Sequence, residues 1–238
     1  MAKEVVLGIV SYNGVPPEVL EDYMKFAFYL GRRCQEYDFG LVVRSRREQY
    51  RSRNAIVTDF LGRNSEYLLM LDDDHIIDIH RSMEEKTLVP SGRYNFVGKL
   101  VKFLEEDPIR GIVGALYYQR GGAYAPVMMH EREGQYFFLE HLEVAHRPQL
   151  VDVTGGGCML LRRELFDRIP SPWFRSETDA GVGTDVQICK AARENGFQVW
   201  CDTSIEIGHI RAKKTVITSR TIASAEAEEE LYASDLDD

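Results

Sequence analysis

The sequence predicts an α/β domain with a mostly parallel sheet, and two observations carry this prediction. Short apolar stretches alternate with longer ones in which apolar residues recur at helical spacing, the order typical of parallel sheets. The apolar stretch at 68–71 then runs directly into Asp72, Asp73 and Asp74. Ionised carboxylates are costly to bury, so these acids mark the carboxyl end of a strand, where open α/β sheets bind ligands. Oxygen ligands suit Mg²⁺ or Mn²⁺, so the segment predicts a metal and phosphate site.

The first half of the chain supplies strands and helices in alternation. Residues 5–11, 39–43 and 68–71 are short apolar runs and are predicted as strands. A turn-forming segment at 12–17 separates the first strand from a helix at 18–34. A second helix is expected at 50–62, where Gly62 ends it. This alternation favours a Rossmann-like arrangement.

The second half is less regular. A helix is expected at 95–107 and a strand at 111–118, and antiparallel strands are plausible between 123 and 150. Further strands are expected at 151–154, 158–161, 199–201 and 205–207, with a helix at 163–168. The helix at 184–195 is expected to be capped by Thr184 or Asp185 and stopped by Gly196. Beyond 212 the chain is a polar, acidic tail, either helical or disordered.

Length and cysteine usage narrow the class of protein. The 238 residues suit one large α/β domain, or alternatively two small ones. No apolar run approaches the roughly 20 residues that cross a bilayer, and the start does not resemble a signal peptide. The four cysteines show no CxxC spacing, so we expect reduced thiols in a cytoplasmic protein.

Charge is unevenly distributed along the chain. Seven acids and no basic residue lie between 226 and 238, and they account for most of the net charge of −9. The stretch from Arg32 to Arg53 holds seven arginines. Such a cluster is either a solvated face or a patch for an anionic ligand such as a diphosphate.

Seven motifs, taken in order, resemble the GT-A-fold glycosyltransferases of the large family-2-like superfamily, over roughly residues 5–211. They are the SYNG turn, Arg53-Asn54, the triple aspartate, Thr154-Gly155-Gly156-Gly157, Trp173-Phe174, Thr184-Asp185 and Gly208-His209-Ile210. The resemblance implies a single Rossmann-like domain at 1–211 with a mostly parallel mixed sheet flanked by helices. Residues 1–118 would form the nucleotide-sugar donor half and 119–211 the acceptor half, followed by the tail at 212–238.

The resemblance also implies roles for the charged motifs. Asp74, Asp72 and His209 would hold Mn²⁺ or Mg²⁺, with Asp72 alternatively touching the ribose, and Asp73 would belong to the donor site or only anchor its loop. Asp185 would be the catalytic base, although an aspartate at a helix start is also a common N-cap. The family usually carries Glu where this chain has Thr184. The resemblance therefore implies that this chain recognises its acceptor differently at that position. The other five histidines, His75 included, are assigned to the surface or core.

The remaining candidates line the donor and acceptor sites. The resemblance places Ser11, Tyr12, Arg44 and Arg53 at the nucleotide, and Gly155, Gly156, Gly157, Trp173 and Thr184 at the sugar or acceptor. Lys213 and Lys214 are candidates for a loop that closes over the diphosphate. Each has a structural alternative: surface arginines for Arg44 and Arg53, a flexible turn for the glycines, core packing for Trp173, and solvated charge for the lysines.

The predicted function is metal-dependent transfer of a sugar from a nucleotide-diphosphate donor, with UDP expected, to an acceptor hydroxyl on a glycan or small molecule. A modified nucleobase in nucleic acid is a further possible acceptor, because the arginine-rich segment can follow a phosphate backbone. The alternatives are a nucleotidyltransferase and a catalytically inactive nucleotide-binding protein. The sequence does not distinguish inverting from retaining chemistry.

Overall fold

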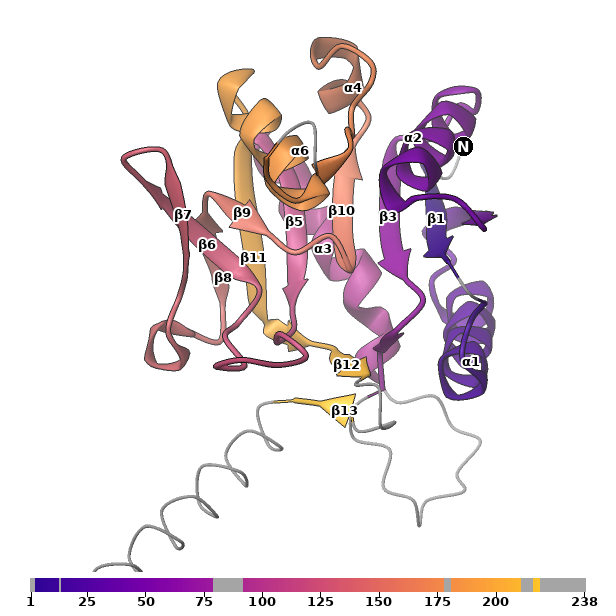
Figure 1. Ribbon diagram of the computed structural model, residues 1–238. Helices are drawn as coiled ribbons and strands as arrows, with labels where there is room; N and C mark the ends of the chain where they lie inside the picture. The colour runs from indigo at the N-terminus through magenta and orange to yellow at the C-terminus, as the bar shows by residue number, and fades with distance from the viewer. Residues whose placement is uncertain (1–2, 13, 79–91, 178–180, 211–215, 219–238) are drawn as a thin grey trace, which may run out of the picture.

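A seven-stranded sheet forms the centre of the molecule, and helices cover both of its faces (Figure 1). The computed structural model describes residues 3–12, 14–78, 92–177, 181–210 and 216–218. Across the sheet the strands are β2 (Tyr37–Ser45), β1 (Lys3–Ser11), β3 (Tyr67–Asp72), β10 (Cys158–Arg162), β5 (Arg110–Leu116), β11 (Gln198–Glu206) and β8 (Pro148–Val151). The predicted α/β class is therefore confirmed.

The sheet is mixed because β10 runs against its neighbours. β1 pairs in parallel with β2 and β3, and β5 pairs in parallel with β11. β10 lies antiparallel between β3 and β5, and β8 is antiparallel to β11. As a result, the Gly155–Gly157 segment that precedes β10 meets the carboxyl end of β3, where the backbone N–H of Asp72 donates to the carbonyl of Gly157 (3.1 Å).

Two hydrophobic cores lie on opposite faces of the sheet, because successive residues of a strand point to opposite sides. In β3, Leu68 and Met70 pack into one core and Leu69 and Leu71 into the other. The first core includes residues of α2 (Gln49–Leu61), α4 (Glu164–Arg168) and α6 (Thr184–Glu194). The second includes residues of α1 (Pro17–Arg33) and α3 (Phe96–Glu105).

Two small sheets extend the central one. The predicted antiparallel strands are confirmed: β6 (Met128–Arg132) and β7 (Gln135–Phe138) form a hairpin whose turn has positive φ at Glu133 and Gly134, and β9 (Val153–Thr154) pairs with β6. In the other small sheet, β12 (Gly208–Ile210) lies between β4 (His75–Ile76) and β13 (Val216–Ile217). The register sets His209 directly opposite His75.

Local differences from the predicted elements have clear causes. Residues 199–201 and 205–207 belong largely to one strand, β11, whose pairing with β5 is interrupted by a register shift between Asp202 and Glu206. The N-cap of α6 is Gly183, without a side-chain cap, so neither Thr184 nor Asp185 caps it. Thr184 is instead engaged by Arg53.

The four cysteines are free and buried, as expected. Among the described helices, none combines the length and apolar character that crossing a membrane requires.

Candidate metal centre and active site

The three aspartates at the carboxyl end of β3 direct their side chains to three separate places. β3 ends at Asp72 and the chain turns at residues 73 and 74, so the strand alternation stops there. The Asp72 carboxylate lies 3.2 Å from Nη2 of Arg53. Asp73 accepts a hydrogen bond from the backbone N–H of Tyr12 (3.2 Å), and Asp74 joins a group of histidines. Adjacent acids therefore serve different functions in the fold.

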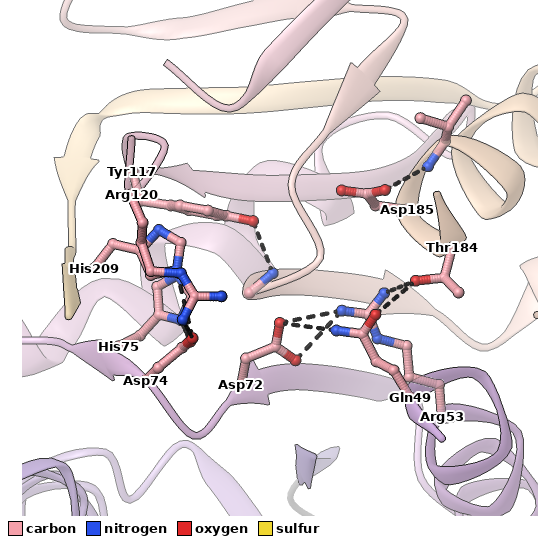
Figure 2. A network of polar contacts seen from close by, with 12 residues as sticks. Gln49, Arg53, Asp72, Asp74, His75, Tyr117, Arg120, Thr184, Asp185 and His209 are labelled. Atoms are coloured by element: carbon pink, nitrogen blue, oxygen red, sulfur yellow. Dashed lines mark hydrogen bonds and ion pairs between the residues drawn. The ribbon is translucent and has the colours of Figure 1, made fainter. Parts of the chain in front are cut away.

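Asp74, His75 and His209 form the candidate metal centre (Figure 2). One ligand atom from each lies within 4.8 Å of the others. Asp74 Oδ1 is 2.9 Å from Nδ1 of His75, and Oδ2 is 3.5 Å from Nε2 of His209. The two imidazoles stack with centroids 4.5 Å apart, as expected for side chains directly opposite each other in an antiparallel pair. Pairing of β4 with β12 thus joins residues that are distant in sequence.

His209 is oriented as metal-binding histidines are. Its Nδ1 donates a hydrogen bond to the backbone carbonyl of Tyr118 (2.8 Å). A carbonyl only accepts, so Nδ1 carries a proton, and Nε2 is the ring nitrogen that faces Asp74. Fixing one ring nitrogen in this way is typical of metal-ligating histidines. The arrangement supports the predicted role of His209.

His75 is the member of this group that the sequence reasoning missed. It is 1 % exposed, and neither ring nitrogen makes a well-formed hydrogen bond to a described residue, although Nδ1 lies close to Asp74. A buried polar atom without a hydrogen-bond partner calls for an explanation, and one explanation is that the atom binds an ion. The sequence did offer one indication of this role, because His75 directly follows the three aspartates.

The surroundings favour an ionised Asp74. Burial by itself would raise the pKa of this carboxyl, but contacts with His209 and His75 outweigh burial and hold the pKa below its usual range. For Asp72, burial raises the pKa, and the ion pair with Arg53 offsets only part of that rise. The two carboxylates therefore differ electrostatically, and Asp74 is the better ligand for a cation.

Arg53 lies beneath the site and does not face an open surface. Arg53 is 2 % exposed, and its guanidinium donates hydrogen bonds to the carboxylate of Asp72 and to the hydroxyl oxygen of Thr184. The Thr184 hydroxyl also donates to Gln49 Oε1 (3.3 Å). Figure 2 shows this network joining α2, β3 and α6. Arg53 and Thr184, which were expected at the diphosphate and the acceptor, are thus placed to position Asp72 and α6.

The three glycines before β10 make room for side chains of the site. A Cβ on Gly155 would lie 2.1 Å from the hydroxyl oxygen of Tyr117, and one on Gly156 would lie 2.5 Å from Nη2 of Arg53. A Cβ on Gly157 would lie 2.3 Å from Cε1 of His75. The predicted close approach therefore occurs, but the neighbours are the protein's own Tyr117, Arg53 and His75.

Asp185, the predicted base, lies in the first turn of α6. Its Oδ1 accepts the backbone N–H of Val186 (2.9 Å), and Oδ2 makes no hydrogen bond to another of the described residues. The pKa of the neighbouring Tyr117 is raised well above its ordinary value. Burial is the largest cause, followed by the negative charges of Asp185 and Asp72. The Tyr117 hydroxyl accepts the N–H of Gly157 (3.1 Å), and the Tyr117 ring also contacts His75. The Tyr117 ring contacts His75 and His209, and in Figure 2 its hydroxyl points toward the side of the site where Asp185 lies.

The predicted nucleotide residues lie at the ends of β1 and β2. Ser11 is buried and its hydroxyl accepts the N–H of Gly14 (3.2 Å), whereas Tyr12 is 63 % exposed and available for contact with a ring. Asp73 anchors this turn through the Tyr12 N–H, as one interpretation of the sequence anticipated. Arg44 forms an ion pair with Asp59 of α2.

Trp173 packs into the first core. Its indole N–H donates to the carbonyl of Ile169 (2.9 Å), and its ring meets Phe166 edge-on. Asn54 holds the same segment by accepting the backbone N–H groups of Trp173 and Phe174. These contacts agree with the alternative of core packing. Lys213 and Lys214 lie outside the described residues.

The donor set fits a divalent cation. Asp74 supplies an ionised oxygen, His209 an oriented nitrogen, and His75 a buried ring whose Nδ1 lies 2.9 Å from Asp74 Oδ1. Imidazole nitrogens suit transition metals, and carboxylate oxygens suit Mg²⁺ and Mn²⁺. A mixed set therefore favours Mn²⁺ over Mg²⁺, which prefers oxygen ligands.

No family model and no curated protein matches the sequence. Among solved structures, protein A197 from STIV is 19 % identical with a TM-score of 0.54, covering 89 % of this chain and 92 % of that one. The mannosyltransferase PcManGT from Pyrobaculum calidifontis, solved with GDP-Man and Mn²⁺, is 13 % identical with a TM-score of 0.51. That match covers 87 % of this chain but 56 % of the mannosyltransferase, so this chain spans little more than half of that protein's length. Likeness at such identities concerns the fold alone, and the chain has a GT-A-like fold.

Proposed function

We propose that this protein is a metal-dependent glycosyltransferase that moves a sugar from a nucleotide-diphosphate donor to an acceptor hydroxyl. The observation that carries the proposal is the Asp74–His75–His209 group at the carboxyl end of β3, with Asp185 nearby at the start of α6. Strand ends of this kind are where open α/β sheets bind ligands.

Asp74, His209 and His75 would hold the cation, with Mn²⁺ the expected ion. When bound, it would neutralise negative charge on the departing diphosphate, as a Lewis acid does. Asp72 is left for the ribose or for a more distant contact with the ion, since Arg53 and Gln49 already engage its carboxylate. The Tyr12 turn, anchored by Asp73, would receive the base.

Asp185 would remove the proton from the acceptor hydroxyl as its oxygen attacks the anomeric carbon. Its Oδ1 is fixed by the Val186 N–H, and this bond orients the carboxylate without occupying Oδ2. Tyr117 keeps its own proton because its pKa is raised, so it does not compete for the acceptor's proton.

The main alternative, nucleotidyl transfer, calls for a glycine-rich phosphate loop after the first strand. Gly14 is the single glycine between Ser11 and the start of α1 at Pro17, so this feature is lacking. The two reactions also release different products: a nucleoside diphosphate in glycosyl transfer and pyrophosphate in nucleotidyl transfer.

The first test is a thermal-shift panel of UDP- and GDP-sugars with and without Mn²⁺. A donor at 100 times its Kd stabilises the folded state by about 2.7 kcal/mol, equivalent to a rise of about 5–11 °C in Tm for a chain of this size. We expect this shift only when Mn²⁺ is present.

Asp74→Asn should abolish the Mn²⁺-dependent shift. Asp38→Asn, which changes an exposed carboxylate of β2, is the matched control and should retain the shift. Donors that yield a shift are then assayed for product. Release of pyrophosphate, or a donor shift of equal size in Asp74→Asn, would overturn the proposed function.

A further inference from the structure

Arg120 is the one basic side chain that contacts the candidate metal centre in the part of the chain described. It follows β5 by a few residues, and its Nη1 lies 2.8 Å from Oδ2 of Asp74. Figure 2 shows its guanidinium beside Asp74. No motif in the sequence assigned it a role.

The guanidinium occupies the place that a cation needs. Oδ2 of Asp74, which Arg120 contacts, is also the oxygen that faces Nε2 of His209 at 3.5 Å. The Asp74 side chain is only 23 % exposed, so water screens charges there weakly. A dication and a guanidinium repel each other, so the two cannot share this oxygen favourably.

Arg120 is free to leave. Its side chain is 54 % exposed, and Asp74 is its only ion-pair partner among the residues the structure describes. Gly121 and Gly122 follow it, and a Cβ built on either would meet no atom within 4 Å. The segment therefore lies in open space, where a small backbone change can carry the guanidinium away from Asp74.

We propose that Arg120 is a diphosphate-binding residue that Asp74 holds until the divalent cation displaces it. The proposal rests on the proposed function, which supplies a donor with two phosphates. A displaced guanidinium stays next to the metal centre, and its planar donor groups match phosphate oxygens in paired hydrogen bonds. The cation's arrival thus changes Arg120 from a partner of Asp74 to a partner of the donor.

Two opposite effects follow. Arg120 lowers the affinity of the nucleotide-free protein for the cation, because the cation must displace it. It raises the affinity of the cation-loaded protein for the diphosphate. Because coupling between two ligands is reciprocal, cation and donor strengthen each other's binding through this residue.

The test measures binding to the full-length protein, with Mn²⁺ titrated by calorimetry and by the electron paramagnetic resonance signal of free Mn²⁺. Arg120→Gln should bind Mn²⁺ about tenfold more tightly than wild type without nucleotide, a change typical of coupled sites. With saturating Mn²⁺, the same variant should bind UDP or GDP about tenfold more weakly, on the same scale of coupling. Arg132→Gln, an exposed arginine of β6, is the matched control and should change neither affinity.

The outcomes separate this inference from the proposed function. Unchanged Mn²⁺ affinity in Arg120→Gln overturns the displacement, and tighter Mn²⁺ with unchanged diphosphate affinity overturns the role in donor binding. If Asp74→Asn binds Mn²⁺ as wild type does, the metal centre itself is refuted and the proposed function fails with it.

Discussion

Replacement of Gly157 by alanine tests whether the glycine segment before β10 shapes the metal centre. The added methyl would lie 2.3 Å from Cε1 and 2.5 Å from Nε2 of His75. Carbon atoms pack at about 3.5–4.0 Å, so the imidazole would have to move by roughly 1 Å. His75 has little room, because the rings of Tyr117 and His209 each lie with centroids 4.5 Å from its own.

The expected cost follows from this confinement. Overpacking of a well-filled interior costs about 1–3 kcal/mol, and we take about 2 kcal/mol for Gly157→Ala. For a domain of this size such a loss lowers Tm by about 4–8 °C. Displacing one ring of the metal centre should also weaken Mn²⁺ binding by about 10–100-fold, as do changes around metal ligands generally.

Differential scanning calorimetry and Mn²⁺ titration measure both quantities. Gly31→Ala in α1 is the matched control, because a Cβ there meets no atom within 4 Å. It should leave Mn²⁺ affinity at the wild-type level and should not lower Tm. If Gly157→Ala matched Gly31→Ala in both measurements, His75 would not be confined by its neighbours.

Three further predictions concern charged residues. Asp185→Asn should reduce the turnover of a donor and acceptor pair by about 10²–10⁴-fold, the contribution of a general base, while donor binding stays at the wild-type level by calorimetry; equal turnover would exclude Asp185 as the base. Arg53→Met should lower the unfolding free energy in urea by about 3–5 kcal/mol, because it leaves Asp72 unpaired in the interior; a loss below about 1 kcal/mol would show that this pair is dispensable. Burial raises the pKa of Asp22, so the folded state binds its proton more tightly, and the Asp22 contribution to stability falls as pH rises from the ordinary carboxyl pKa through the raised one. The difference in unfolding free energy between wild type and Asp22→Asn should therefore decline over that interval, and a flat difference would contradict it.

Local pattern predicted much of the fold. The apolar run before Asp72 predicted a buried strand end, and helical spacing predicted α1 and α2 to within one residue at each end. Strand direction has no local signature in a short apolar run, so the antiparallel insertion of β10 between β3 and β5 could not be predicted from residues 158–161.

The candidate site likewise combines residues that local motifs predicted with residues that long-range contacts determine. Asp74 and His209 were predicted as metal ligands through the ordered motifs, and the structure places them together with His75. His75 was missed because its neighbour across β4 and β12 is set by a long-range register. Arg53 was expected to meet the diphosphate or to lie on the surface, and its ion pair with Asp72 explains why it is buried instead.

The two-residue ladder between β4 and β12 makes a bound cation a cross-link within the chain. Asp74 and His75 belong to the first third of the sequence, and His209 follows the last strand of the central sheet. The backbone N–H of Ile210 donates to the carbonyl of Asp74 (2.8 Å), so the same two segments share hydrogen bonds and candidate ligands. Binding of a cation there and local unfolding of β12 would therefore be linked equilibria, and a bound cation would slow amide exchange where the two segments meet.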